Sequence, residues 1–363
     1  MLQDKHPQSR DPGPAAMKHY EELSDFIDLD ITSEHVENVA KKMSGAAGLS
    51  GFDSSARKFL LLSHGQASNR LLGVIAKFSQ WLSNDTPPFA AFRAALANRL
   101  IVMDKFPGVR PIGIGNVWRR LIAKCVLVVA GHSATTACGS DQLCAGLRAG
   151  TDGAIHGVST LWNELEESDS DSGFLLIDAN NAFNEINRIN MLWTIRHEWP
   201  AGARFAFNCY SHHSLLIVRN AGGTALFIFS KEGVTQGDPI AMFCYGIIGI
   251  LPMIRDLKQQ HSKFKQPWYT DNAGASGCFD ATARMFTDLM KIGPDFSYYP
   301  NLSKSILVTP TNKLATAKKH FNQSYGLGFR VCSGHPYLGG FISNTSFCDE
   351  FVSSKISSWT QTI

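Results

Sequence analysis

The spacing of hydrophobic residues predicts helices for most of the first hundred positions. From Ala56 to Leu100, leucines, alanines and aromatic residues recur every three or four positions, with a turn at Asn84 to Pro88, which is the pattern of a packed helical layer. Two short helices are expected between Tyr20 and Gly48, the second around Glu34 to Met43. The first sixteen or so residues carry prolines and charges and are expected to form a disordered tail.

Short apolar strands begin near position 100. Leu100 to Met103 and Arg110 to Ile114 predict a β-hairpin, with its turn at Phe106-Pro107-Gly108. Helices are expected from about Asn116 to Val129 and from about Gly150 to Glu167. The middle of the chain is therefore expected to combine strands with helices.

One long apolar stretch, Ile240 to Ile254, contains no charged residue. It is shorter than a membrane-spanning helix and is interrupted by Gly246, Gly249 and Pro252. We therefore expect a buried helix of a large core, and no association with a membrane.

Composition limits the class of protein only loosely. The 363 residues are 44% hydrophobic, which is enough for a globular protein with a sizeable core. The eight cysteines form no CxxC pair and the N-terminus lacks the apolar run of a signal peptide, so reduced thiols in an intracellular protein of the nucleus or cytoplasm are expected, without a zinc site. The net charge of +3 and the pI of about 8.4 permit a nucleic-acid partner without requiring one.

The apolar run Gly173 to Ile177 stops on a carboxylate, Asp178, and passes into the helical pattern Asn181 to Trp199. A strand that is buried on both faces has this pattern, and an aspartate at its carboxyl end lies where strands present ligands to a cleft. On this pattern alone, Asp178 as a helix cap is an equally good interpretation.

A second candidate site lies in Trp268 to Ala275, where two β-forming residues precede Thr270, Asp271, Asn272 and a run of small residues. The pattern predicts a hairpin whose turn is Asp271-Asn272, because both residue types tolerate turn geometry. An ordinary structural hairpin remains the alternative.

Between these two segments, Lys231 to Pro239 forms a glycine-rich loop that leads into the long apolar helix. Asp238 before Pro239 is a favourable helix start. Gly233 and Gly237 allow the backbone to approach another group closely. A loop that only caps the helix is the alternative.

In this order, and followed by Asn301 to Ser305 and Tyr337 to Gly340, these segments resemble the palm of reverse transcriptases. Val109 to Ile114, with Trp118-Arg119-Arg120 and Lys124, resembles the fingers motif of non-LTR retrotransposon and group II intron enzymes. The resemblance covers about Leu100 to Ile342.

This resemblance implies an α+β right-hand polymerase fold, in which an antiparallel palm sheet packs on helices and is accompanied by fingers. It implies an N-terminal tail with short helices at 1–55, a helical layer and fingers at 56–172, a palm with interleaved fingers elements at 173–342, and the start of a truncated thumb or connector at 343–363. The chain would then be part of a larger polyprotein of a mobile element.

The activity implied by the resemblance is RNA-directed DNA polymerisation. Asp178 and Asp271 would hold two Mg²⁺ or Mn²⁺ ions about 4 Å apart. The partners would be an RNA template, a DNA primer and dNTPs. Asn272 departs from the family, which usually has a second aspartate here; its amide oxygen can join the metal site but brings no charge.

The remaining roles also come from the resemblance. Phe183 would exclude a ribose 2′-hydroxyl and so favour dNTPs, with a core aromatic as the alternative. Lys304 would protonate the leaving pyrophosphate, with a surface lysine as the alternative. Residues expected to bind the nucleotide are Arg110, Lys124, Phe183, Gln236 and Gly237; those expected to form the primer grip are Tyr337, Leu338 and Gly339. Arg119 and Arg120 are further candidates for the triphosphate, and at least one of them is expected to be a solvated helix residue.

Two other functions are compatible with the sequence. A catalytically inactive, reverse-transcriptase-like protein that binds nucleic acid would retain the same motifs, and Asn272 favours it. An unrelated metal hydrolase with two carboxylates would require the loop and fingers motifs to be coincidental.

Overall fold

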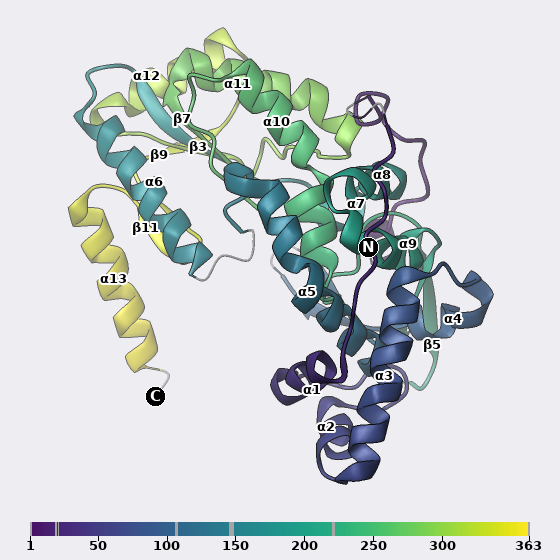
Figure 1. Ribbon diagram of the computed structural model, residues 1–363. Coiled ribbons are helices and arrows are strands. Elements are labelled where there is room, and N and C mark those ends of the chain that lie inside the picture. The colour runs from purple at the N-terminus through teal and green to yellow at the C-terminus, as the bar shows by residue number, and fades with distance from the viewer. Residues whose placement is uncertain are drawn as a thin grey trace. The chain divides into compact units, whose positions relative to one another are not determined.

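The chain folds into two units, each assembled from segments that are far apart in the sequence (Figure 1). The computed structural model describes residues 2–18, 20, 22–105, 108–144, 149–219 and 222–361. The first unit comprises Met1–Gly139, Asn181–Pro252 and Asp295–Ser297; the second comprises Ser140–Asn180, Met253–Pro294 and Tyr298–Ile363. Both units contain helices and β-sheets, so the predicted α+β class is confirmed. The subdomain boundaries predicted at 56, 173 and 343 stay predictions.

Helices of the first unit pack around α5 and a π-helical segment, η3. α5 contacts α1, α3, α8, α9 and η3, and α3 also packs on α1, α2 and α9. The described helical elements of this unit are α1 (Ser33–Lys42), α2 (Ser54–Leu62), α3 (Gln66–Asn84), α4 (Phe89–Leu96), α5 (Val117–Cys138), α7 (Ala182–Glu185), α8 (Arg188–Glu198), α9 (Pro200–Tyr210) and η3 (Phe243–Gly249).

Several helix predictions are confirmed and others need correction. α1 and the helices between positions 54 and 96 lie where the pattern placed them, although Ser63 to Gly65 separates α2 from α3. The first of the two short helices expected before Gly48 is absent from the described residues 22–31, which have no regular secondary structure. This segment is held instead by contacts of its side chains, such as the ion pair of Asp28 with Arg204 on α9.

The helix predicted from Asn181 to Trp199 is broken into α7 and α8. The break falls at Asn187, whose side chain accepts a hydrogen bond from the backbone N–H of Asn190 at 3.0 Å and so starts a new helix. The apolar stretch from Ile240 is buried as predicted, but its middle is π-helical and not α-helical. Gly249 permits this wider turn, because a Cβ atom there would lie 2.3 Å from the carbonyl oxygen of Cys244.

α5 continues nine residues beyond the predicted end at Val129. Val117–Asp141 is long and apolar enough to cross a membrane by length and composition, and half of its most apolar window is buried. Core helices can have the same composition. α5 is a core helix of the first unit: it contacts several other helices, and even its Arg119 and Arg120 are buried.

The sheet of the first unit has the strand order β2-β1-β4-β5. Its strands are β1 (Asn98–Asp104), β2 (Val109–Gly115), β4 (Ser214–Arg219) and β5 (Ala225–Ser230). β1 and β2 pair antiparallel with Leu100 opposite Gly113, so the predicted hairpin is confirmed. Of the predicted turn, Phe106 and Pro107 lie outside the described residues.

The second unit contains a five-stranded sheet in the order β6-β7-β3-β8-β9 and a small hairpin, β10-β11. Its strands are β3 (Ser172–Ile177), β6 (Trp268–Tyr269), β7 (Asn272–Cys278), β8 (Ile306–Val308), β9 (Arg330–Cys332), β10 (His335–Tyr337) and β11 (Gly340–Ile342). Its helices are α6 (Gly150–Glu167), most of α10 (Leu251–Gln260), α11 (Phe279–Ile292), α12 (Leu314–Lys319) and α13 (Thr345–Thr360). β6, β7, β3 and β8 pair antiparallel, whereas β9 pairs parallel with β8. The sheet expected for a palm is therefore present, packed on helices and antiparallel except at its β9 edge.

β3 is buried on both faces, as the apolar run predicted. Phe174 lies in a core cluster with Val158 and Trp162 of α6, while α11 packs on β3 and β7 from the other face of the sheet (Figure 1). Small residues on β7 make room for these contacts: a Cβ atom at Gly274 would lie 2.9 Å from the ring of Phe174. The packing therefore keeps the carboxyl end of β3 in a fixed position relative to β7.

Candidate active site

Asp178 and Asp271 lie at the same end of two neighbouring strands. β3 and β7 are antiparallel, with Ile177 opposite Ala273. Continuing this register by one residue sets Asp178 opposite Asn272, with Asp271 one position further along. Neighbouring strands are roughly 5 Å apart, so the Cα atoms of Asp178 and Asp271 are roughly 5–7 Å apart. The structure thus brings together two carboxylates that are far apart in the sequence.

The turn that carries Asp271 differs by one residue from the predicted turn. Tyr269 pairs with Asn272, so the turn residues are Thr270 and Asp271, and Asn272 is the first residue of β7. Thr270 has a positive φ of 58°. The prediction of Asp271-Asn272 as the turn was therefore wrong, because turn propensity favoured the asparagine whereas the pairing of β6 with β7 requires it in the strand.

The buried phenol of Tyr298 contacts the backbone of Asp271. Its hydroxyl donates a hydrogen bond to the carbonyl oxygen of Asp271 at 2.9 Å, and its side chain is fully buried. The pKa of Tyr298 is raised well above its ordinary value, first by burial and then by the negative charges of Asp271 and Asp178. The phenol therefore remains a hydrogen-bond donor, and both carboxylates are close enough to act on it.

The segment that begins at Asn301 is attached to the end of β3. The backbone N–H of Asn301 donates to the carbonyl of Asp178 at 2.8 Å, and its side-chain amide donates to Asn180 at 2.6 Å. Lys304 follows one short turn later, and its ammonium lies 3.7 Å from a carboxylate oxygen of Asp178. The Lys304 side chain is 48% exposed and that of Asp178 is 33% exposed, so solvent screens the pair and both remain accessible.

The donor set at this end of the sheet suits Mg²⁺. Within the part of the chain that the structure describes, no group of three or more His, Cys, Asp or Glu side chains is placed to hold a metal ion. Asp178, Asp271 and the amide of Asn272 are hard oxygen donors. Mg²⁺ is commonly bound through one or two carboxylates together with substrate phosphates and water, so two carboxylates are a sufficient protein contribution.

The hairpin predicted as the primer grip packs against the strand that carries Asp178. Tyr337 is buried and its ring meets that of Phe174 edge-on at 6.3 Å. Burial raises the pKa of Tyr337 to about 12, and Tyr269 contributes to the rise. Leu338 and Gly339 form the turn between β10 and β11, with φ of 50° and 95°, and Gly339 is exposed. The turn is thus the part of this hairpin that is available to a ligand.

Three of the residues predicted to bind the nucleotide are connected through the loop before Asp238, in the first unit. The N–H of Gly113 on β2 donates to the carbonyl of Gln236 at 2.7 Å. Gly237 has φ of 102°, and a Cβ atom there would lie 2.6 Å from the carbonyl oxygen of Gly113, so only glycine fits. The N–H of Val234 donates to the carbonyl of Phe183 at 2.7 Å, which ties α7 to the same loop.

Phe183 is only partly buried. Its ring lies 4.7 Å from that of Tyr245 in η3, with an interplanar angle of 33°. One face of the ring is therefore supported by the core of the first unit, while part of it remains accessible. Both the sugar-excluding role and the core-aromatic alternative remain compatible with this position.

The basic residues predicted to bind the triphosphate fall into two groups. Arg110 on β2 and Lys124 on α5 are exposed. Arg119 is buried in an ion pair with Asp238 at 2.8 Å, and Arg120 is buried with one nitrogen 2.6 Å from the carbonyl of Ala46. The prediction that one of Arg119 and Arg120 is solvated was wrong, because Asp238 and the carbonyl of Ala46 hold the two guanidinium groups inside the first unit.

The predictions from sequence missed Tyr298 and the amide of Asn301. No local pattern marks Tyr298, whose contact with Asp271 joins positions 27 apart, although it stands in an aromatic pair before Pro300. Asn301 was included in a motif, but only Lys304 within that motif was given a role. Tyr298 donates a hydrogen bond to the backbone carbonyl of Asp271, and the N–H of Asn301 donates one to that of Asp178. The spacing of residues in the sequence does not predict such contacts.

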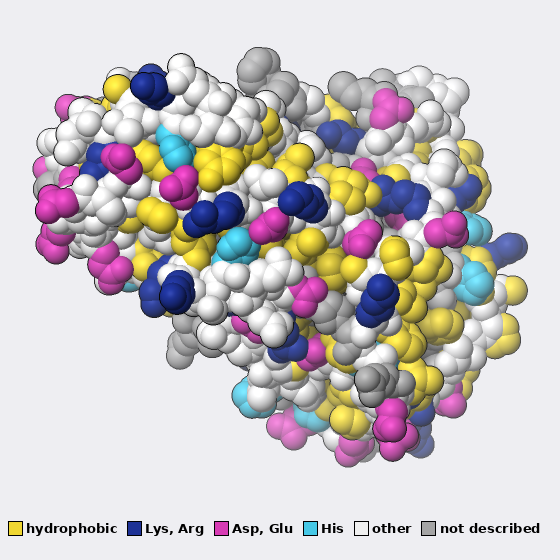
Figure 2. Space-filling model, turned by 90° about the horizontal axis from the view of Figure 1, so that it is seen from above, with side chains coloured by type: hydrophobic (Ala, Val, Ile, Leu, Met, Phe, Trp, Pro, Cys, Tyr) yellow, Lys and Arg dark blue, Asp and Glu magenta, His cyan; other side chains and the backbone are white. Residues whose placement is uncertain are grey.

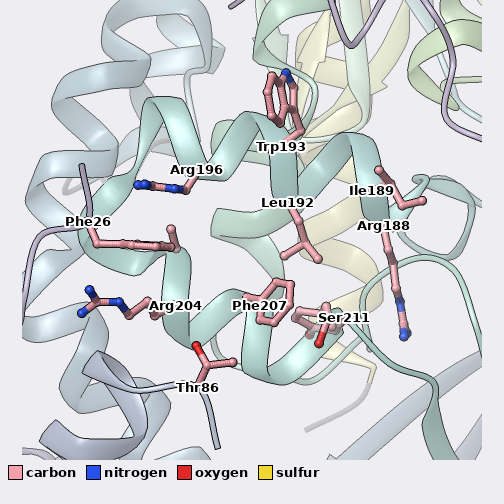
Figure 3. A pocket seen from close by; sticks show the side chains of 12 residues that line it. Phe26, Thr86, Arg188, Ile189, Leu192, Trp193, Arg196, Arg204, Phe207 and Ser211 are labelled. Atoms are coloured by element: carbon pink, nitrogen blue, oxygen red, sulfur yellow. The ribbon is translucent and has the colours of Figure 1, made fainter. Parts of the chain in front are cut away.

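An apolar pocket of about 570 Å³ lies between α8 and α9 of the first unit (Figure 3). At one end the ring of Phe26 lies between two guanidinium groups, 3.5 Å from that of Arg196 and 4.4 Å from that of Arg204. The lining includes Leu192 and Phe207 but none of the residues predicted to bind metal, nucleotide or primer. The pocket is therefore distinct from the candidate active site in its residues.

Charge is distributed evenly over the face of the molecule shown in Figure 2. Lys and Arg side chains there are interspersed with Asp and Glu side chains, and hydrophobic side chains lie between them. This agrees with the small net charge of +3. On this face, no extended field of one sign would attract a polyanion.

No protein-family model and no curated protein matches the sequence. Among solved structures, the chain is similar to telomerase from Candida albicans in complex with a TWJ fragment of telomeric RNA, with 11% identity and a TM-score of 0.45 over 59% of this chain and 43% of that chain. It is also similar to apo telomerase from Candida tropicalis, with 11% identity and a TM-score of 0.46 over 66% of this chain and 48% of that chain.

The chain spans less than half the length of either telomerase chain. TM-scores below 0.5 at this identity support no conclusion about activity. The case for a function rests on the geometry of the chain's own residues.

Proposed function

We propose that this chain is the catalytic part of an RNA-directed DNA polymerase of a mobile element, which transfers nucleotides to a primer 3′-hydroxyl. The observation that carries the proposal is that Asp178 and Asp271 lie directly beside the ends of the antiparallel strands β3 and β7, at the same end of the sheet, where the phenol of Tyr298 contacts the backbone of Asp271. Two accessible carboxylates on adjacent strands are the minimum that a two-metal nucleotidyl transfer requires.

Asp178 and Asp271 would hold two Mg²⁺ or Mn²⁺ ions, and the amide oxygen of Asn272 would complete the protein ligands. When bound, such ions lower the pKa of the primer hydroxyl and neutralise the charge of the leaving pyrophosphate. Tyr298 fixes the backbone of Asp271 through its carbonyl, and Asn301 does the same for Asp178. These contacts hold the two ligand-bearing residues still, which preorganises the site.

Lys304 would move a proton in this reaction. Its ammonium group lies 3.7 Å from a carboxylate oxygen of Asp178. The ammonium group of Lys304 would donate a proton to the leaving pyrophosphate.

Residues around Gln236 would bind the nucleotide. Gln236 and Gly237 are held against β2, the strand that also carries Arg110, and Phe183 is tied to the same loop. Exposed Arg110 and Lys124 can contact triphosphate oxygens. The ring of Phe183 would select dNTPs. The turn Leu338-Gly339 would hold the primer end.

A catalytically inactive, nucleic-acid-binding relative of such an enzyme is the second candidate. Asn272 favours it, because the amide removes one negative charge from the site, and the ion pair between Lys304 and Asp178 removes part of another.

The decisive experiment is primer extension on an RNA template with dNTPs and Mg²⁺ or Mn²⁺, with Mn²⁺ binding measured on the same preparations. Wild type should extend the primer, and Asp178→Asn and Asp271→Asn should each lower the rate by at least about 10²-fold. Asp169→Asn is the matched control, because this exposed carboxylate lies near the opposite end of β3.

The outcomes separate the two candidates. Extension by wild type that depends on both aspartates supports the polymerase. A silent wild type with an active Asn272→Asp variant supports the inactive relative. If neither protein extends a primer or binds Mn²⁺, the metal site assigned to Asp178 and Asp271 is wrong.

A further inference from the structure

Gln142 is fully buried and makes two hydrogen bonds to one residue of the turn that carries Asp271. Its side-chain amide donates to the carbonyl of Thr270 at 3.0 Å and accepts from the N–H of Thr270 at 2.8 Å. The two residues are 128 positions apart. A glutamine amide has one donor side and one acceptor side. It can therefore pair with the carbonyl and the N–H of one turn residue, as the backbone of a neighbouring strand would.

The contact continues along the hairpin. The backbone N–H of Leu143 donates to the carbonyl of Trp268 at 2.8 Å, and the hydroxyl of Thr151 lies 2.9 Å from that of Tyr269. Gln142, Leu143 and Thr151 therefore each contact β6 or the turn that follows it. Buried backbone groups need partners, and Thr270 is only 4% exposed; Gln142 supplies partners to both its N–H and its carbonyl.

The conformation of Thr270 explains why such support is needed. Its φ of 58° is rare for a β-branched residue. A two-residue turn with positive φ at its first central position strongly favours glycine there. Threonine at this position is strained, and a strained residue persists only when its surroundings hold it.

We propose that Gln142 is a positioning residue, which holds Thr270 in its strained conformation and thereby directs the carboxylate of Asp271 toward that of Asp178. The inference deepens the proposed polymerase function and, for its catalytic consequence, rests on it. We call the two hydrogen bonds between Gln142 and Thr270 the clamp. Without the clamp, the turn relaxes to a conformation that threonine prefers, and the side chain of Asp271, the next residue, changes direction. The hydrogen bond from Tyr298 to the carbonyl of Asp271 holds the other side of the same turn but does not constrain φ of Thr270.

The clamp itself is tested by amide hydrogen exchange, without reference to activity. In Gln142→Ala, exchange at the N–H of Thr270 should be at least about tenfold faster than in wild type. Gln266→Ala is the matched control, because this buried glutamine of the same unit donates its amide to the carbonyl of Leu257 and not to the turn. Unchanged exchange at Thr270 in Gln142→Ala would overturn the inference.

The positioning role is tested by rescue. Gln142→Ala should weaken Mn²⁺ binding and slow primer extension, each by about tenfold or more. Thr270→Gly should be close to wild type, and the double variant Gln142→Ala/Thr270→Gly should recover to within about twofold, because glycine adopts the required φ without support. A glutamine that mattered only for core packing would not be rescued by a change in the turn, so a double variant as impaired as Gln142→Ala refutes the positioning role.

A further variant keeps the test decisive if Gln142→Ala does not fold. Gln142→Glu keeps the size of the side chain and an acceptor for the N–H of Thr270, but loses the donor to its carbonyl. It should weaken Mn²⁺ binding, and Thr270→Gly should again restore it; absence of rescue refutes the role. If wild type neither binds Mn²⁺ nor extends a primer, the proposed function fails, whereas faster exchange at Thr270 still establishes the clamp.

Discussion

Removal of the carboxylate of Asp238 should be one of the most destabilising single changes in the first unit. Asp238 accepts from Arg119 at 2.8 Å and from the hydroxyl of Tyr210 at 2.5 Å through the same oxygen, while its other oxygen accepts from the N–H of Ile240 at 3.3 Å. The side chains of Arg119 and Asp238 are 4% and 1% exposed. Burial by itself lowers the pKa of Arg119, but the charge of Asp238 raises it above its ordinary value, so the pair is strongly coupled.

The expected loss of unfolding free energy depends on which buried polar group loses its partner. Asp238→Ala leaves a buried guanidinium without its counter-ion, and breaking a buried pair in this way costs about 3–5 kcal/mol of unfolding free energy. Arg119→Met/Asp238→Leu removes both charges and leaves the hydroxyl of Tyr210 and, at the weaker 3.3 Å contact, the N–H of Ile240 without their acceptor, a loss of about 1–3 kcal/mol. Adding Tyr210→Phe should bring the total close to wild type, because all three polar groups are then replaced by apolar groups of similar size.

Urea unfolding followed by circular dichroism measures these differences in free energy. Glu37→Gln is the control, because Glu37 and Lys41 form an exposed i,i+4 pair on α1 whose loss should change stability by about 0.5 kcal/mol or less. Gln236 lies two residues before Asp238, so Asp238→Ala should also raise KM for dNTPs. The reasoning fails if Asp238→Ala destabilises by less than about 1 kcal/mol, or if the double variant is as unstable as the sum of the single variants.

Three further predictions concern single residues. Phe183→Val should raise the use of rNTPs relative to dNTPs at least about tenfold in primer extension, because a smaller side chain leaves room for a 2′-hydroxyl. If the preference for dNTPs is unchanged, Phe183 only packs against the core. Lys304→Gln should lower kcat about 10²-fold without weakening Mn²⁺ binding, because it removes a proton donor and a competing cation from Asp178; an unchanged kcat argues against proton donation. Burial, and secondarily the charge of Arg188, lower the pKa of His6 from 6.5 to about 4 in the folded chain. The neutral imidazole therefore contributes stability above about pH 6.5 that is lost as the pH falls toward 4, up to about 3 kcal/mol, and His6→Leu should flatten the dependence of thermal stability on pH between 7 and 5; a parallel loss in both proteins would contradict this assignment.

Local patterns located the elements whose partners are close in the sequence. The hairpin of β1 and β2 is specified by two apolar runs that pair with each other. α6 lies at the predicted positions, Gly150 to Glu167, because its apolar spacing persists over its whole length. Such elements need little information from the rest of the chain.

Errors arose where a distant partner outweighed local preference. Residues 22–31 have apolar spacing that suits a helix, yet they form no regular secondary structure, and Asp28 pairs with Arg204. The turn at Thr270-Asp271 conflicts with the preference of threonine, and Gln142 supports it across 128 positions. The burial of Arg119 depends on Asp238, 119 positions away. In each case the deciding contact joins residues whose separation carries no periodic signal.

For the candidate site, the sequence by itself determined the residue types and their order: a carboxylate after a buried strand, a glycine-rich loop before a buried helix, and a second carboxylate in a hairpin. Only the tertiary structure decided that Asp178 and Asp271 share one end of a sheet, that Tyr298 and Gln142 hold the turn beside them, and that Arg119 belongs to the core. The physical reason is that strand pairing and burial are set by the packing of the whole chain, whereas periodicity reports only which face of a segment is apolar.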